Sequence, residues 1–160
     1  MTVEDYNKCV DDHADGVYRF ILKNLKDQDT ARDIVQDAFE RLWLRFREIS
    51  KEKAKSWLFS TAYHLMIDLI RRQKFNANWN ESTMEPFAED GYTDLKEILD
   101  EAFRRLPEIQ RSVILLRDYE GYSYQEIGDI TKLNESQVKV YIFRARNFLK
   151  QYIGKPEQVI

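Results

Sequence analysis

Two helix-capping signals lie on either side of a short turn near the end of this chain, and they strongly restrict how that part folds. Ser123 is followed three residues later by Glu126, a capping box in which hydroxyl and carboxylate satisfy backbone donors left free by the first helical turn. Asn134 and Gln137 repeat the signal. Gly128 lies between them, at a position where its small size lets a second helix cross closely. The spacing predicts a helix-turn-helix unit.

The second helix of this unit has two unlike faces when its residues are placed about 100° apart. One face is an apolar stripe, formed by Val138, Ile142, Ala145, Leu149 and Tyr152. The opposite face carries Ser136, Val140, Phe143 and Asn147, with Lys139, Arg144, Arg146 and Lys150 along its edges. A face that mixes basic and apolar side chains predicts contact with something other than water.

Local charge indicates which partner this face meets. Residues 132 to 155 hold six basic side chains and one acid, a local charge of +5. Duplex DNA is a polyanion, so caps, turn and charge together predict a DNA-binding unit. Charge alone would favour the alternative, an ordinary solvated basic helix.

Composition excludes several other classes of protein. The chain has 160 residues, 43% of them hydrophobic, and a net charge of −3. Its longest uncharged stretch, residues 56 to 67, is shorter than the roughly 18 apolar residues that a membrane span needs. No signal-peptide pattern opens the chain, so we expect a cytoplasmic protein without membrane insertion. The single cysteine, Cys9, has no companion for a disulfide or metal site, and we expect no metal and no cofactor.

Hydrophobic periodicity divides the chain into two helical parts. The predicted helices run from Glu4 to Leu25, from a cap at Thr30 through Phe46, from about Lys53 to Gln73, from Asp94 to Arg105, and from Pro107 to just before Gly121, ahead of the helix-turn-helix. Residues 76 to 93 lack a period and contain acids but no Lys or Arg. We predict an all-α fold of two small domains, 1–75 and 94–155, joined by a flexible acidic linker at 76–93 and followed by a tail at 156–160.

The third predicted helix has a polar and aromatic strip on an otherwise apolar surface. The strip comprises Trp57, Thr61, His64, Asp68 and Arg71. Basic residues stand at both ends of this helix: Lys51, Lys53 and Lys55 at its start, and Arg71, Arg72 and Lys74 at its end. Aromatic rings between basic ends suit single-stranded nucleic acid, whose unpaired bases can stack. A core position for Trp57 and an ordinary surface role for His64 form the alternative.

The second predicted helix has an acidic face. Asp33, Asp37 and Glu40 share one side of it, while its apolar residues point elsewhere. On a chain that binds DNA, an acidic stripe predicts a contact with protein rather than with phosphate. A solvated acidic face is the alternative.

Three segments, taken in order, resemble a known family. They are DTARDIVQDAFERLW at 29–43, WLFSTAYHLMIDLIRR at 57–72 and LPEIQRSVILLRDYEGYSYQEI at 106–127. They resemble a bacterial RNA polymerase sigma factor of the sigma-70 family, most closely the extracytoplasmic-function (ECF) group, which has only sigma regions 2 and 4. The resemblance covers nearly the whole chain. It implies a region 2 helical bundle followed by a region 4 helix-turn-helix.

The resemblance also implies a function and partners. Such a protein binds core RNA polymerase, recognises the minus-10 and minus-35 promoter elements and promotes DNA opening for transcription initiation. Asp33, Gln36, Asp37 and Glu40 would dock on the clamp helices of the largest polymerase subunit. The region 4 part would rest on the flap of the second-largest subunit, and a cognate anti-sigma factor is an implied partner.

Two sets of DNA-binding residues follow from the same resemblance. The minus-10 element would be read as a separated strand by Lys53, Lys55, Trp57, Thr61, His64, Asp68, Arg71 and Arg72. The minus-35 element would be read in the major groove by Ser136, Gln137, Lys139, Val140, Tyr141, Phe143, Arg144 and Arg146. His64, Val140 and Tyr141 replace the Asn, Ser and Arg that are common in this group, so these positions can alter promoter choice. We hypothesise that Val140 and Phe143 contact thymine methyl groups.

Two other classes of function are weighed against a sigma factor. A helix-turn-helix transcriptional regulator that acts without polymerase would explain the C-terminal part equally well, but it leaves the strip around Trp57 unexplained. Such a regulator would bind duplex DNA tightly on its own. An enzyme is disfavoured, because two His, one Cys and no phosphate-binding loop leave little chemistry to assign.

Overall fold

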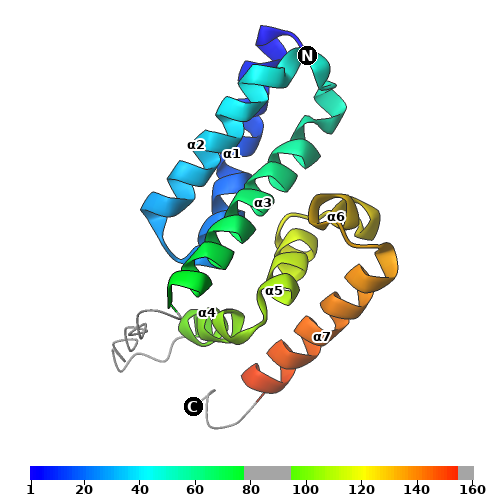
Figure 1. Ribbon diagram of the computed structural model, residues 1–160. Coiled ribbons are helices and arrows are strands. Elements are labelled where there is room, and N and C mark those ends of the chain that lie inside the picture. The colour runs from blue at the N-terminus through cyan, green and yellow to red at the C-terminus, as the bar shows by residue number, and fades with distance from the viewer. Residues whose placement is uncertain (78–94, 155–160) are drawn as a thin grey trace.

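The computed structural model describes residues 1–77 and 95–154, and in these ranges all of the regular structure is helical (Figure 1). The helices are α1 Val3–Leu25, α2 Gln28–Arg45, η1 Phe46–Glu48, α3 Lys51–Ala77, α4 Leu95–Arg105, α5 Glu108–Ile114, η2 Leu115–Tyr119, α6 Tyr124–Thr131 and α7 Glu135–Ile153. The all-α prediction is confirmed. Among the described helices, none combines the length and apolar character needed to cross a membrane.

The long helices α1, α2 and α3 pack as a bundle around an apolar core (Figure 1). Each of the three contacts the other two, and Phe20, Leu42, Leu58 and Met66 are among their fully buried side chains. α3 extends to Ala77, four residues beyond its predicted end. The rest of the predicted linker, the predicted cap at Asp94 and the tail at 156–160 lie outside the described residues.

α2 begins before the cap that the sequence suggested. Asp27 is the N-cap, and its carboxylate accepts hydrogen bonds from the backbone N–H groups of Asp29 at 3.1 Å and Thr30 at 3.3 Å. The Thr30 hydroxyl donates to the same carboxylate at 2.8 Å. The predicted cap at Thr30 is therefore wrong, because Asp27 caps the helix one turn earlier and Thr30 already lies within its first turn.

The helix predicted from Pro107 to just before Gly121 is present over that range, but it is not α-helical throughout. Pro107 stands at the N-cap of α5, and the chain stays helical to Tyr119. Its last turns widen into the π-helical segment η2, where the Glu120 N–H donates to the Leu115 carbonyl at 3.1 Å. This widening places Tyr119 and Glu120 toward the first half of the molecule, which they contact.

α6 and α7 form the predicted helix-turn-helix, with both capping boxes in place. The Ser123 hydroxyl accepts from the Glu126 N–H at 3.1 Å, and the Asn134 side-chain oxygen accepts from the Gln137 N–H at 2.8 Å. Both reciprocal bonds are present. The two helices are thus started by their own sequences.

The turn between α6 and α7 depends on a close backbone approach. A Cβ atom on Gly128 would lie 2.6 Å from the Leu133 carbonyl oxygen, a separation that real Cβ atoms do not adopt. Lys132 ends α6 in the left-handed conformation with φ of 64°. Only glycine fits at position 128, but the group that requires it is the backbone of the turn at Leu133, whereas Val138 of the crossing helix α7 lies at an ordinary contact distance of 3.8 Å.

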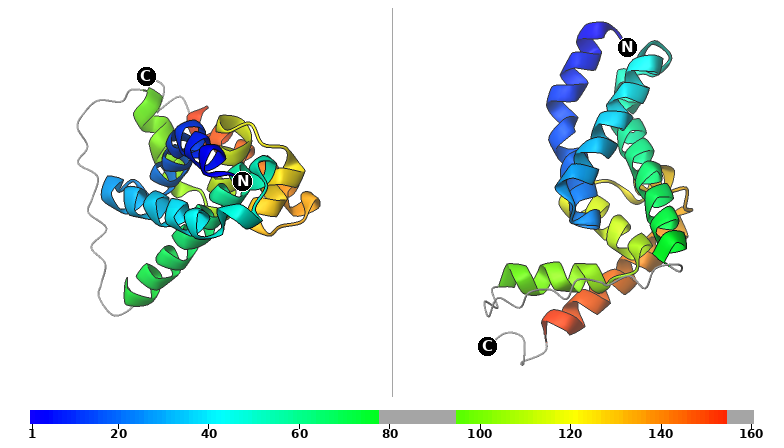
Figure 2. Two further views of the ribbon diagram at one scale, coloured as in Figure 1. Left: turned by 90° about the horizontal axis from the view of Figure 1, so that it is seen from above. Right: turned by 60° about the vertical axis from the view of Figure 1, so that its left-hand side comes forward.

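The two halves of the molecule lie against each other (Figures 1 and 2). α6 packs along α3, α5 contacts α1, and one continuous set of buried side chains includes residues of both halves. The rings of Phe59 in α3 and Tyr122 just before α6 meet edge to face, with centroids 5.3 Å apart. The periodicity of single helices carries no information about this contact.

Candidate nucleic-acid interface

The outer face of α7 has the composition that the sequence predicted. Val138, Ile142, Ala145 and Leu149 are buried, while Ser136, Gln137, Lys139, Val140, Phe143, Arg144 and Arg146 are exposed. Phe143 is 65% exposed and Val140 is 45% exposed, which is unusual for side chains of this kind on a helix that has a core-facing side. Tyr141 differs from the rest of the predicted set, since it is half-buried against the core.

Two cations of this face are engaged by acids within the molecule. The Lys139 ammonium lies 3.5 Å from the Glu135 carboxylate, one turn earlier in α7. The Arg146 guanidinium donates to the Asp118 carboxylate of η2 at 2.6 Å, and this hydrogen bond raises the pKa of Arg146. Both pairs are solvent-exposed, so each is weak enough to exchange its acid for a phosphate.

α3 brings its predicted strip onto one side, where part of it is open to solvent. Trp57, Thr61 and His64 are half-buried, and Asp68, Arg71, Arg72 and Lys53 are exposed. Trp57 packs against the core with one side only. It is therefore neither a core residue nor a free surface side chain. The strip therefore offers an aromatic ring and polar groups along the helix with cations at both ends.

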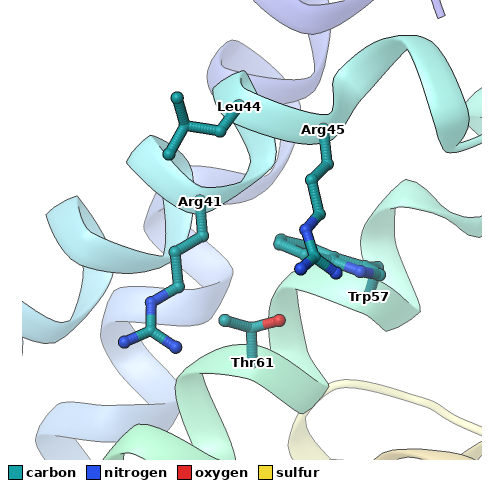
Figure 3. Close-up of a pocket in the computed structure, with 5 residues that line it drawn as sticks. All are labelled: Arg41, Leu44, Arg45, Trp57 and Thr61. Atoms are coloured by element: carbon teal, nitrogen blue, oxygen red, sulfur yellow. The ribbon is translucent and has the colours of Figure 1, made fainter.

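α2 supplies a second wall that turns the strip into a cavity. Arg41 and Arg45 extend from α2 toward Trp57 and Thr61 of α3 (Figure 3). With Leu44 these residues line a cavity of about 480 Å³. Nothing in the sequence pattern singled out Arg41 and Arg45 as members of this site. They are one helical turn apart, which places them on one side of α2, but only the packing of α2 on α3 makes that side face Trp57.

A smaller cavity continues along α3 toward the helix-turn-helix. It has a volume of about 280 Å³ and is lined by Arg41, Ser60, Thr61, His64, Leu65, Asp68 and Lys132. The His64 Nδ1 lies 2.6 Å from the Ser60 carbonyl oxygen. Because a carbonyl can only accept, Nδ1 is the donor in this hydrogen bond, which leaves Nε2 to meet other groups in the cavity. An Asn would offer both a donor and an acceptor at this position.

The acidic stripe of α2 is exposed and has an apolar end. Asp33, Gln36 and Glu40 are exposed, and the Gln36 amide donates to Glu40 at 3.3 Å. Asp37 is half-buried and accepts from Arg41 at 3.1 Å. Leu44 follows Glu40 by one turn and is 81% exposed. The acidic stripe thus ends at a large apolar side chain open to solvent, and nothing in the sequence pattern singled out Leu44.

The structure joins a helix-turn-helix, whose outer face is basic and apolar, to a bundle with an aromatic and cationic cavity. This combination defines a DNA-binding protein that acts in transcription. Residues 9–76 match the family model for Sigma-70 region 2, and residues 96–149 match that for Sigma-70, region 4. The chain belongs to the sigma-70 family of RNA polymerase sigma factors, in the ECF group.

Several relatives share this organisation along nearly their whole length. RNA polymerase sigma factor SigV of Bacillus subtilis (strain 168) is 32% identical over 155 residues, which cover 93% of this chain and 91% of SigV. ECF RNA polymerase sigma factor SigM of the same organism is 28% identical over 156 residues, 94% of each chain. The sigma factor RpoE from Bartonella quintana, solved in complex with the anti-sigma factor NepR, shares the fold with a TM-score of 0.80 at 22% identity, over 96% of this chain and 99% of that one.

Membership of this family fixes the general function. The protein directs RNA polymerase in promoter recognition and transcription initiation, as a subunit without catalytic activity of its own. Core RNA polymerase is accordingly its partner. The alternative of a regulator that acts without polymerase is not supported, because both halves of the chain match sigma regions.

Proposed function

We propose that this sigma factor reads a promoter with two separate surfaces. The α3 strip and its cavity bind the minus-10 element as an opened strand, and the outer face of α7 binds the minus-35 element as duplex. Residues 1–75 and 94–155 are the two functional units, with 76–93 as the linker between them. The observation that carries this proposal is the cavity lined by Arg41 and Arg45 of α2 and by Trp57 and Thr61 of α3, in which Arg45 lies over the Trp57 ring (Figure 3).

The cavity suits an unpaired nucleotide better than a base within duplex DNA. A volume of about 480 Å³ is in the range of small-ligand sites. A base can enter such a pocket only after it leaves the stack, where the Trp57 ring offers a new stacking partner. Arg45, and Arg41 once it exchanges the Asp37 carboxylate for a phosphate, would neutralise the flanking phosphates of that nucleotide. Lys53, Arg71 and Arg72 would bind the backbone of the strand along α3. Thr61, His64 and Asp68 would contact its bases.

The α7 face suits the major groove, which is wide enough for one helix. Lys139 and Arg144 stand on its two edges, where they reach phosphates or base edges, with Ser136, Gln137 and Arg146 alongside. The exposure of Val140 and Phe143 supports their proposed contact with thymine methyl groups. Tyr141 is the weakest member of this set because its ring is partly committed to the core.

Protein partners would use other surfaces. The docking face, Asp33, Gln36, Asp37 and Glu40 with Leu44 added, would bind the clamp helices of the largest polymerase subunit. A partner surface that fits it would offer cations to the acids and an apolar patch to Leu44. The region 4 unit would rest on the flap of the second-largest subunit. An anti-sigma factor is a further proposed partner, supported by the complex with the anti-sigma factor NepR in which the structural relative RpoE was solved.

Selection from a pool of random-sequence duplex DNA tests this assignment. The protein bound to core polymerase is expected to enrich two short sequence blocks at a fixed spacing. The isolated protein is expected to enrich none, because neither small basic surface makes many phosphate contacts. Enrichment of a single block by the polymerase-bound protein would remove the two-reader proposal. Strong enrichment by the protein alone would point back to a stand-alone regulator.

A further inference from the structure

One cation on the outer face of α7 is held by an acid from another helical segment. Asp118 belongs to η2, which continues α5, and α5 packs along α7 (Figure 1). The Arg146 guanidinium donates to the Asp118 carboxylate through Nη2 at 2.6 Å and through Nε at 3.4 Å. The two residues are 28 positions apart, so this is not the common pairing of neighbours on one helix. The pair ties the end of the Arg146 side chain to the body of the region 4 half.

The bond to Asp118 occupies one side of the guanidinium group and leaves another side facing outward. An arginine carries its N–H donors in a planar fork. Asp118 takes the side with Nε and Nη2, so the end with Nη1 and Nη2 can still bind a phosphate through paired hydrogen bonds. A phosphate can therefore bind Arg146 without displacing Asp118. Part of the entropy cost of ordering this long side chain has already been met in the free protein.

Tyr124, at the first position of α6, supports the same arginine. The hydrogen bond to Asp118 raises the pKa of Arg146, and the Tyr124 hydroxyl adds to this rise as a further hydrogen-bond partner. The centre of the Tyr124 ring lies 4.4 Å from the Arg117 Cζ and 5.6 Å from the Lys139 Nζ. Lys139 and Arg146 are about two helical turns apart and share one edge of α7. Asp118 thus lies where cations gather beside the DNA face.

The charge of Asp118 works against DNA binding at this place. Its side chain is 39% exposed, and a carboxylate there repels the phosphates of an approaching duplex. The Arg146 side chain is 49% exposed, and an ion pair between groups this exposed contributes little to folding. Fold stability therefore gives a weak account of the pair. An orienting effect on Arg146 that exceeds the repulsion gives a stronger one.

We infer that Asp118 is a positioning residue of the minus-35 surface, which holds the Arg146 guanidinium so that its outer end binds a DNA phosphate beside the minus-35 element. This inference deepens the proposed function and rests on it, because it assigns a phosphate to one of the proposed contacts of α7. Phosphate contacts fix the position of a protein on the duplex, whereas base contacts carry its specificity. Loss of Asp118 is therefore expected to weaken binding by α7 without changing the sequence that it prefers.

Removal of the Asp118 carboxylate is a sharp test, because charge and orientation predict changes of opposite sign. D118A removes a negative charge close to the duplex, so charge alone predicts tighter binding. Loss of orientation predicts that the affinity that depends on the minus-35 element falls about five- to tenfold. D118E keeps a carboxylate within reach of Arg146 and should recover most of the loss. D129A removes an acid from an exposed position of α6 and should leave this affinity unchanged.

Variants of Arg146 show whether Asp118 acts through it. R146A should lower the same affinity at least as much as D118A does. The D118A/R146A double variant should bind no more weakly than R146A, because Asp118 then has nothing to orient. R146A should also reduce the slope of log affinity against log salt by about one, the value of one phosphate contact, and D118A should reduce it in the same direction. A role in folding alone would lower the thermal midpoint and leave this slope unchanged.

The measurement uses holoenzyme assembled from core polymerase and each full-length variant. A dye-labelled duplex with both blocks from the random-sequence selection competes with the same duplex whose upstream block is scrambled. Unchanged or tighter binding by D118A, additive losses in the double variant, or selection of a different upstream block by D118A overturns the positioning role and leaves the two-surface proposal standing. If wild-type holoenzyme does not distinguish the two duplexes, the proposed function fails, and the role of Asp118 fails with it. A loss in D118A that D118E restores, and that is absent when Arg146 is already replaced, establishes the role.

Discussion

Replacing Trp57 by Ala is expected to slow promoter opening by about 5- to 150-fold, since stacking on an aromatic ring contributes roughly 1–3 kcal/mol per base. Trp57 forms one wall of the α2–α3 cavity and is half-buried, so it can meet a base without leaving its place. Affinity for core polymerase should change little, because Leu44 alone of the docking face lines this cavity. The rate is measured by 2-aminopurine fluorescence from the minus-10 element after mixing with holoenzyme.

Two further variants make this result specific. Trp57→Phe keeps a ring in the cavity and should recover most of the rate. Trp43→Ala removes another partly exposed tryptophan, one that packs on Tyr6 outside the cavity, and should leave the rate as it is. Equal losses in Trp57→Ala and Trp43→Ala would show that general destabilisation of the bundle, rather than base stacking, is being measured.

Replacing Gly128 by Ala is expected to lower the free energy of unfolding by about 1–3 kcal/mol, the usual cost of overpacking. The added Cβ would meet the Leu133 carbonyl oxygen at 2.6 Å, and backbone on both sides prevents relief by rotation of a side chain. Elsewhere inside a helix the same change stabilises by up to about 1 kcal/mol, so even the sign is diagnostic. Thermal unfolding followed by circular dichroism measures the effect.

The effect of Gly128→Ala on DNA binding should be confined to the minus-35 surface on α7. Distortion of the turn displaces α7, so binding that depends on the minus-35 element is expected to fall, while binding of a pre-opened minus-10 strand by the holoenzyme persists. Asp129→Ala changes the next, exposed position of α6 and should alter neither property. A Gly128→Ala protein as stable as the wild type would contradict the close approach at the turn.

The features that could be predicted from sequence are those set by neighbouring residues. Ser123 with Glu126 and Asn134 with Gln137 each start a helix by bonds within one turn, and both were found as predicted. The exposed face of α7 followed from the helical period alone. The start of α2 was misplaced by one turn because Asp27 and Thr30 are both residue types that cap helices, and the choice between them depends on which residue takes extended backbone angles.

The features that could not be predicted depend on how separate helices pack. Arg41 and Arg45 are ordinary surface arginines until α2 meets α3, and only then do they line a cavity with Trp57 and Thr61. Lys55 was assigned to DNA, yet its ammonium lies 4.5 Å from the centre of the Tyr122 ring in the other half of the molecule. Asn24 and Arg111 are 87 positions apart and carry no periodic signal, although they join the two halves.

Run-off transcription with purified core polymerase and this protein on a library of random promoter fragments measures the central claim directly. We expect initiation that requires the protein, at start sites preceded by two shared sequence blocks, and we expect Trp57→Ala to reduce it at every one of those sites. No added initiation on any fragment, with polymerase that responds to another sigma factor, would contradict the assignment of these two surfaces as a promoter reader.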